Sequence, residues 1–111
     1  MKNPRPYLLL ILDTLNIIRE NTPKDKIDFL NDPNAQDATL MRLQDIGEQL
    51  IHIRDKFSEF YEQNDNNEWN KIVGLLNIIA HGYRGVDFEI IWDIVVNRLD
   101  NFYRQISDLS Q

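Results

Sequence analysis

Cysteine is absent from this 111-residue sequence, and only two histidines are present. The absence of cysteine excludes disulfide bonds and thiolate metal sites. Long apolar segments are absent as well, since the longest run, Tyr7 to Leu12, is far too short to cross a bilayer. The first residues do not combine a basic stretch, a long apolar stretch and a small-residue cleavage site, so no secretory signal is expected. We therefore expect a cytoplasmic protein without a membrane partner.

Positive charge is scarce in the sequence. Twelve Lys and Arg residues stand against eighteen Asp and Glu residues, which gives a net charge of −6 and a pI near 4.7. General nucleic-acid coat proteins use a basic face to displace counterions from phosphates, so this balance argues against that class. Any RNA contact must come from a local basic cluster, or from a dimer groove that concentrates a few basic groups. The acidity also has a simpler explanation, since it keeps a small protein soluble.

The composition predicts one globular domain over residues 1–111. Hydrophobic residues make up 42% and charged residues 27% of the chain, which is ordinary for a folded domain with its own core. Apolar residues at three- and four-residue steps predict long helices over about 6–21 and 34–61, with a single helical turn over 26–31. Thr22-Pro23 ends the first helix, and Asp32-Pro33 offers a cap and a first-turn proline for the next.

The second half of the chain predicts two more helices. A polar loop over 63–67 precedes a helix from Trp69 to His81, which is apolar on most sides and is expected to be central or interfacial. Asp87 is the predicted N-cap of a last helix that carries an apolar stripe to Ile106. No strand-like alternation competes with these patterns. The sequence therefore predicts an all-α fold, an antiparallel bundle of four to five helices.

Polar residues gather at the end of the apolar helix Trp69–His81. Asn77 and His81 are four residues apart and so share one helical face. A histidine at a helix C-terminus lies at the negative end of the helix dipole, which favours its protonated form. Gly82 follows, where the backbone must turn out of the helix. A lone histidine here is usually a packed or capping residue, but the grouping with Asn77 suggests a functional site.

This segment resembles the signature of the HEPN superfamily, and within it the HepT-like toxins encoded beside a minimal nucleotidyltransferase antitoxin. The signature reads Gly-x-Arg-Asn-x-x-x-His-x-Tyr, followed by a Gly-Val-Asp turn into a last helix. The matching residues here are Gly74, Asn77, His81, Tyr83, Gly85, Val86 and Asp87. Upstream, Asp37-Ala38 and the run Arg42 to Glu48 resemble the second-helix pattern of the family. The likeness covers about residues 7–106.

The resemblance implies a homodimeric ribonuclease that cleaves RNA without a metal ion, in a groove along the dimer axis. Such cleavage needs a base for the 2′-hydroxyl, an acid for the leaving oxygen and stabilisation of charge on the phosphate. One histidine cannot easily supply all three, whereas two copies of His81 converge if the helices meet across a dimer axis. His81 is then the acid/base, and Asn77 positions the histidine or the phosphate. The chain itself needs no cofactor.

Tyr83 matches the tyrosine to which, in the resembling family, the antitoxin transfers adenylyl groups. The resemblance therefore implies a nucleotidyltransferase partner that uses ATP and magnesium, while this chain uses neither. Gly82 before the tyrosine and Arg84-Gly85 after it favour exposure of the hydroxyl. Packing of the ring at the edge of the bundle is the alternative, and the two are compatible because a buried ring can keep its hydroxyl in water.

Position 76 departs from the family signature, because Leu76 stands where the family has its catalytic arginine. An arginine would bind the scissile phosphate through two hydrogen bonds and stabilise its charge. Loss of one such contact commonly costs about 100- to 1000-fold in rate. Three explanations are open: a naturally weakened or inactive toxin, compensation by Arg42 or Arg84, or a sequence altered to permit expression. The alternative function is a catalytically inactive HEPN module that binds a nucleotidyltransferase or RNA.

The remaining candidates are basic, acidic and aromatic side chains outside the signature. Arg42 and Arg84 are the predicted RNA-binding residues, although Arg42 and Glu48 can instead form a structural ion pair. Glu48 and His52 share a helical face, but two ligands are too few for a metal site and the paired Glu-x-x-His motifs of di-metal bundles are missing, so we expect no metal. Trp69 and Trp92 are expected to fill the core.

Overall fold

The computed structural model describes residues 3–80 and 83–111, apart from the side chains at 79, 80 and 83. These residues form seven α-helices and one short 3-10 helix, and they contain no strand. The predicted all-α bundle is therefore confirmed. Two predicted features of the helix end, His81 and Gly82, lie outside the described residues.

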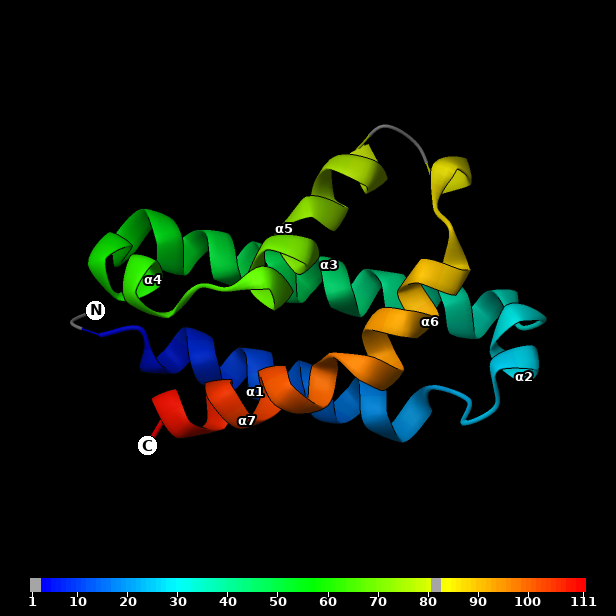
Figure 1. Cartoon of the computed structure of the whole chain (residues 1–111), viewed down its shortest axis with the longest axis horizontal. Helices are drawn as coiled ribbons and strands as arrows, with labels where there is room; N and C mark the ends of the chain where they lie inside the picture. The colour runs from blue at the N-terminus through cyan, green and yellow to red at the C-terminus, as the bar shows by residue number, and fades with distance from the viewer. Residues whose placement is uncertain (1–2, 81–82) are drawn as a thin grey trace.

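The first and third helices of the chain are antiparallel, and a short second helix connects them. They are α1 (Arg5–Asn21), α2 (Lys26–Leu30) and α3 (Pro33–Lys56). α1 and α3 lie side by side along the length of the molecule, and α2 joins them at one end (Figure 1). The predicted cap at Asp32 is confirmed, because its carboxylate accepts a hydrogen bond from the Ala35 amide at 3.0 Å. α1 ends before Pro23, as the sequence predicts.

The prediction of a single helix over 34–61 is wrong, because the helix is interrupted at Phe57. This residue has φ −138° and ψ 58°, outside the helical region, and α4 (Ser58–Asn64) begins directly after it. The break turns the Phe57 ring toward Tyr7 on α1, with ring centroids 6.5 Å apart. It also lets the buried Tyr61 meet Trp69 edge to face, at 5.1 Å. Tertiary packing of aromatic rings therefore overrides the helical pattern.

The last helix is also divided, at Arg98. The second half of the chain forms α5 (Asn67–Ala80), a 3-10 helix η1 (Tyr83–Gly85), α6 (Phe88–Asn97) and α7 (Leu99–Leu109). Arg98 has φ −123° and ψ −28° and interrupts the single helix predicted after Asp87. α6 contacts α2, whereas α7 packs along α1, so a straight helix would not satisfy both contacts. The cap at Asp87 is confirmed, since its side chain accepts from the Glu89 amide at 2.9 Å.

The core lies between the α1–α3 pair and the helices α5 and α7. Trp69 is fully buried, as predicted, and its indole nitrogen donates to Gln105 Oε1 at 2.8 Å. Trp92 is only half-buried and packs against the ring of Phe29 at the edge of the core, so its predicted core position is only partly met. α5 begins against the bundle and then rises from it, so that its C-terminal end and η1 project from the body of the molecule (Figure 1).

Candidate functional site

The apolar face of α5 packs on α3. Ile72 and Leu75 are buried, and Leu76 is half-buried beside Gly47. A Cβ atom added to Gly47 would lie 3.3 Å from the backbone oxygen of Ile72 and 3.3 Å from Cγ of Leu76. Both contacts are tighter than ordinary van der Waals distances, so the absence of a side chain at position 47 permits this approach. Position 76 thus lies where α5 crosses α3.

The outer face of α5 is open. A Cβ atom added to Gly74 would meet nothing within 4 Å, and Ile78, four residues later on the same face, is 43% exposed. Asn77 is also exposed. A mid-helix glycine costs about 1 kcal/mol relative to alanine, and no neighbour within the described chain requires one here. A further exposed apolar side chain lies on α6, where Ile90 is 56% exposed.

The segment between α5 and α6 carries half of the six predicted site residues, namely His81, Tyr83 and Arg84. His81 and the side chain of Tyr83 lie outside the described part of the chain. The backbone of Tyr83 begins η1, and Arg84 in the same turn is exposed. The described site therefore consists of Leu76 and Asn77 at the end of α5 and Arg84 in η1.

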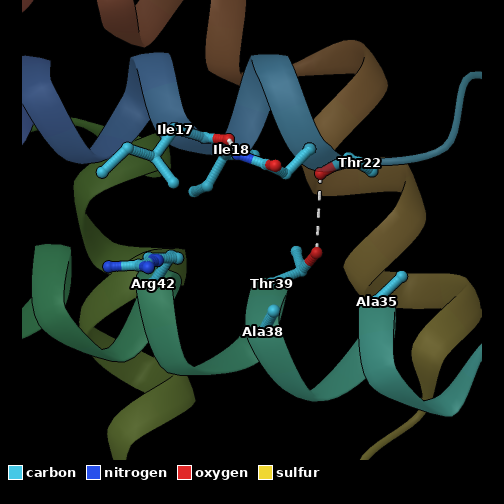
Figure 2. Close-up of a pocket in the computed structure, with 8 residues that line it drawn as sticks. Ile17, Ile18, Thr22, Ala35, Ala38, Thr39 and Arg42 are labelled. Carbon is cyan, nitrogen blue, oxygen red and sulfur yellow. Dashed lines mark hydrogen bonds between the residues drawn. The ribbon is translucent and has the colours of Figure 1, made fainter.

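The structure places Arg42 away from Leu76. Arg42 is five residues before Gly47, so the two positions face directions about 140° apart around α3. Arg42 lines a pocket together with Ile17 and Asn21 of α1, on the side of α3 that faces that helix (Figure 2). Glu48 is exposed, and no ion pair found among the described side chains joins it to Arg42.

The second histidine, His52, has a packing role. Its ring stacks on Tyr7 with centroids 5.7 Å apart, and the Tyr7 hydroxyl accepts from Lys56 Nζ at 2.7 Å. Within residues 3–80 and 83–111, no group of three or more His, Cys, Asp or Glu residues is arranged to hold a metal ion.

Burial raises the pKa of Tyr61 above its ordinary value of 10.0; Asp65 raises it further and Arg54 opposes this. The hydroxyl of Tyr61 is thus kept protonated.

Comparison with known protein families identifies the family to which this chain belongs. The family model described as "Ribonuclease HepT-like" matches residues 11–109, which is nearly the whole length. The chain belongs to the HepT-like family. The family is part of the HEPN superfamily, in agreement with the resemblance read from the signature residues. Its all-α fold is the one observed here.

Several relatives of this HepT-like chain are similar to it over most of their lengths. A protein named "Putative RNase" from Caldanaerobacter subterraneus is 30% identical over 112 residues, which cover 100% of this chain and 97% of that protein. Another protein with the same description, from Methanocaldococcus jannaschii, is 32% identical over 97% of this chain and 88% of its own length. A "Probable ribonuclease HepT" of Thermococcus cleftensis is 27% identical over 85% and 84%. No solved structure matches this chain.

Two features of this HepT-like domain were not predicted from the sequence. The contact between Gly47 and Leu76 is one, and its only sequence signal is a glycine inside a long helical pattern, which usually has a packing reason when it is tolerated. The pocket beside Arg42 is the other, and it depends on how α1 and α3 pack.

Among the described helices, none combines the length and the apolar character needed to cross a membrane.

Proposed function

We propose that this chain is a homodimeric, metal-independent endoribonuclease whose activity is weakened by the leucine at position 76. The packing of Leu76 over Gly47 is the observation that carries the proposal. A leucine side chain has no hydrogen-bond donor, so it cannot bind the scissile phosphate as the arginine of the family signature does. The residues for proton transfer and positioning, His81 and Asn77, remain in the signature.

The proposed chemistry is an in-line attack within the RNA. The 2′-oxygen attacks the neighbouring phosphorus while His81 of one protomer accepts the hydroxyl proton. The bond from phosphorus to the 5′-oxygen breaks, and the second His81 gives its proton to that leaving oxygen. The products are a 2′,3′-cyclic phosphate and a free 5′-hydroxyl. The Asn77 amide donates a hydrogen bond to the phosphate or holds the histidine, and Arg84 contributes positive charge; Arg42 stays a candidate for RNA contact farther along the strand.

A dimer through α5 and α6 is the proposed assembly. The open face of Gly74, the exposed Ile78 and the exposed Ile90 support it, because all three flank the segment that carries His81. Glycine allows another backbone to approach closely, and the two isoleucines supply apolar surface for burial. A stable pair of this kind buries more than about 1,000 Å² in total.

Regulation by adenylylation of Tyr83 completes the proposal, with a nucleotidyltransferase as partner. The other tyrosines are less suited as acceptors, which supports this choice. Tyr61 is only 7% exposed. The Tyr7 hydroxyl accepts a hydrogen bond from Lys56, and the Arg19 guanidinium covers the ring of Tyr103 at 4.0 Å. An adenylyl group on Tyr83 adds a phosphate charge two residues from His81 and would repel the RNA backbone.

A catalytically inactive binding module is the second candidate function, and the same leucine favours it. A side chain that packs at a helix crossing has a structural use even when no reaction takes place. Cleavage of labelled RNA by the chain and by its Leu76→Arg variant separates the two candidates. A gain of cleavage with arginine supports the weakened enzyme, and no cleavage by either protein supports the binding module.

A further inference from the structure

We infer that the pocket between α1 and α3 binds a small carboxylate with a short aliphatic body. This site is distinct from the proposed cleavage site, because it opens beside α1 rather than beside α5, but it includes Arg42, which is also the candidate for RNA contact farther along the strand. Figure 2 shows the last turns of α1 facing the N-terminal half of α3 across the pocket, with Arg42 at one end of it. The pocket has a volume of about 230 Å³.

The walls of the pocket are mostly apolar. Ile17 and Ile18 of α1 form one side, while Ala35 and Ala38 of α3 form the other. The two alanines leave room that larger side chains would fill. Such a surface favours aliphatic groups over water, since burial of each methylene removes apolar surface from water. The body of the ligand is therefore expected to be a short hydrocarbon chain.

The two threonine hydroxyls of the pocket share one long hydrogen bond (Figure 2). Thr39 is only 4% exposed, and its hydroxyl lies 3.5 Å from the hydroxyl of Thr22. This exceeds the usual range for a hydrogen bond between two hydroxyls, about 2.5–3.0 Å, and buried hydroxyls are normally better paired. The Asn21 amide, by contrast, already donates to the Ile17 backbone oxygen at 2.8 Å. A ligand oxygen beside Thr39 would offer its hydroxyl a shorter hydrogen bond than the one to Thr22.

Arg42 supplies the charge for an anion. None of the hydrogen bonds or ion pairs found within residues 3–80 and 83–111 occupies its guanidinium. The nearby carboxylate of Asp45 is held by α1, where its Oδ2 accepts from the Thr14 hydroxyl at 3.0 Å. A guanidinium binds a carboxylate through two parallel hydrogen bonds, which fixes the orientation of the ligand with its chain between the helices.

The size of the pocket limits the ligand. At about 30 Å³ for each water-sized group, the volume holds roughly eight heavy atoms. A six-carbon carboxylate has this size, whereas a nucleotide is far larger. A ligand this small is expected to bind with a dissociation constant of roughly 1 mM. The proposal therefore concerns a short-chain organic acid and not an RNA strand.

Two-dimensional NMR titration of the full chain tests the site, with hexanoate as the probe. We expect saturable shifts in the signals of Ala38, Thr39 and Arg42, with weaker effects of hexanol, which lacks the charge, and of inorganic phosphate, which lacks the chain. Arg42→Gln should weaken hexanoate binding about tenfold or more, and Ala38→Leu should fill the pocket and abolish it. Arg54→Gln, which removes an exposed arginine from the same helix, should leave binding unchanged.

Three results would overturn the proposal. Equal binding of hexanol and hexanoate would mean that Arg42 does not recognise the anion. Binding of phosphate or a mononucleotide without binding of hexanoate would assign Arg42 to RNA contact instead. No saturable shift in the wild-type chain, at probe concentrations well above the expected dissociation constant, would leave the pocket without this ligand. None of these outcomes depends on whether the chain cleaves RNA.

Discussion

The side chain of Leu76 covers Gly47 at the crossing of α5 and α3. A Cβ atom at position 47 would lie 3.3 Å from Leu76 Cγ and equally close to the backbone oxygen of Ile72. An arginine at position 76 would start with the same Cβ and Cγ atoms, so its aliphatic stem could also pass over the glycine and carry the guanidinium toward solvent. Gly47 therefore accommodates either residue, and position 76 decides whether a charge is present at the site.

Gly47→Ala should destabilise the fold through this contact. The added methyl group crowds α5, which costs about 1–3 kcal/mol, while the better helix propensity of alanine returns up to about 1 kcal/mol. We expect the free energy of unfolding, measured by urea denaturation, to fall by about 1 kcal/mol. In a Leu76→Ala background the same substitution should cost less, because the crowded side chain is gone. Equal effects in both backgrounds would show that the two residues are not coupled.

Ile78→Asp and Ile90→Asp should each weaken the dimer. Both side chains are already exposed in the single chain, at 43% and 56%, so a charge there should cost little folding stability. Burying that charge in an interface would be unfavourable. Light scattering at micromolar concentration should give a dimer for the wild-type chain and a lower mass for both variants. Ile27→Asp, at a 68% exposed isoleucine on α2, is the matched control and should remain dimeric. A monomeric wild-type chain would refute the assembly.

Tyr83 is expected to accept the adenylyl group. Incubation with the cognate nucleotidyltransferase, ATP and magnesium should increase the mass of the chain by one or more AMP groups, and Tyr83→Phe should remove the increase without loss of helix content. Modified chain should also bind RNA more weakly, because the added phosphate repels the RNA backbone. Peptide mapping by mass spectrometry that places the group on Tyr7, Tyr61 or Tyr103 would be incompatible with this site.

Tyr61 should make the stability of the fold sensitive to alkaline pH. Burial, with Asp65, raises the pKa of its hydroxyl above 10.0, so the folded state favours the neutral form. This contribution is complete below the unfolded pKa of 10.0 and is lost as the pH rises through the folded pKa. The free energy of unfolding should therefore fall above about pH 10, and it should fall less steeply for Tyr61→Phe. Equal slopes for the two proteins would exclude a contribution from this tyrosine.

Features that depend on local sequence could be predicted, whereas those set by packing could not. The caps at Asp32 and Asp87 follow from side chains that bond to amides two or three residues away, and the burial of Trp69 follows from the apolar pattern. The breaks at Phe57 and Arg98 occur within unbroken helical patterns, because contacts with distant helices decide them.

The candidate site divides in the same way. The signature residues could be read along the sequence, and the family that they resemble is confirmed by the family model. The position of Arg42 could not be predicted in this way. The direction of a residue around its helix shows what the residue faces only when the positions of the neighbouring helices are known. The reason for a glycine at position 47 likewise depends on its contact with Leu76, which lies 29 positions later in the sequence.

Metal-independent cleavage of labelled RNA, measured with a chelator present, tests the central claim most directly. The wild-type chain should cleave weakly, and Leu76→Arg should raise the rate, by up to about 100- to 1000-fold if the guanidinium reaches the scissile phosphate. Adding His81→Ala to Leu76→Arg should abolish the gain, while Leu76→Met, which keeps an apolar side chain, should not increase the rate. A wild-type chain that is already fully active and gains nothing from Leu76→Arg would contradict the account.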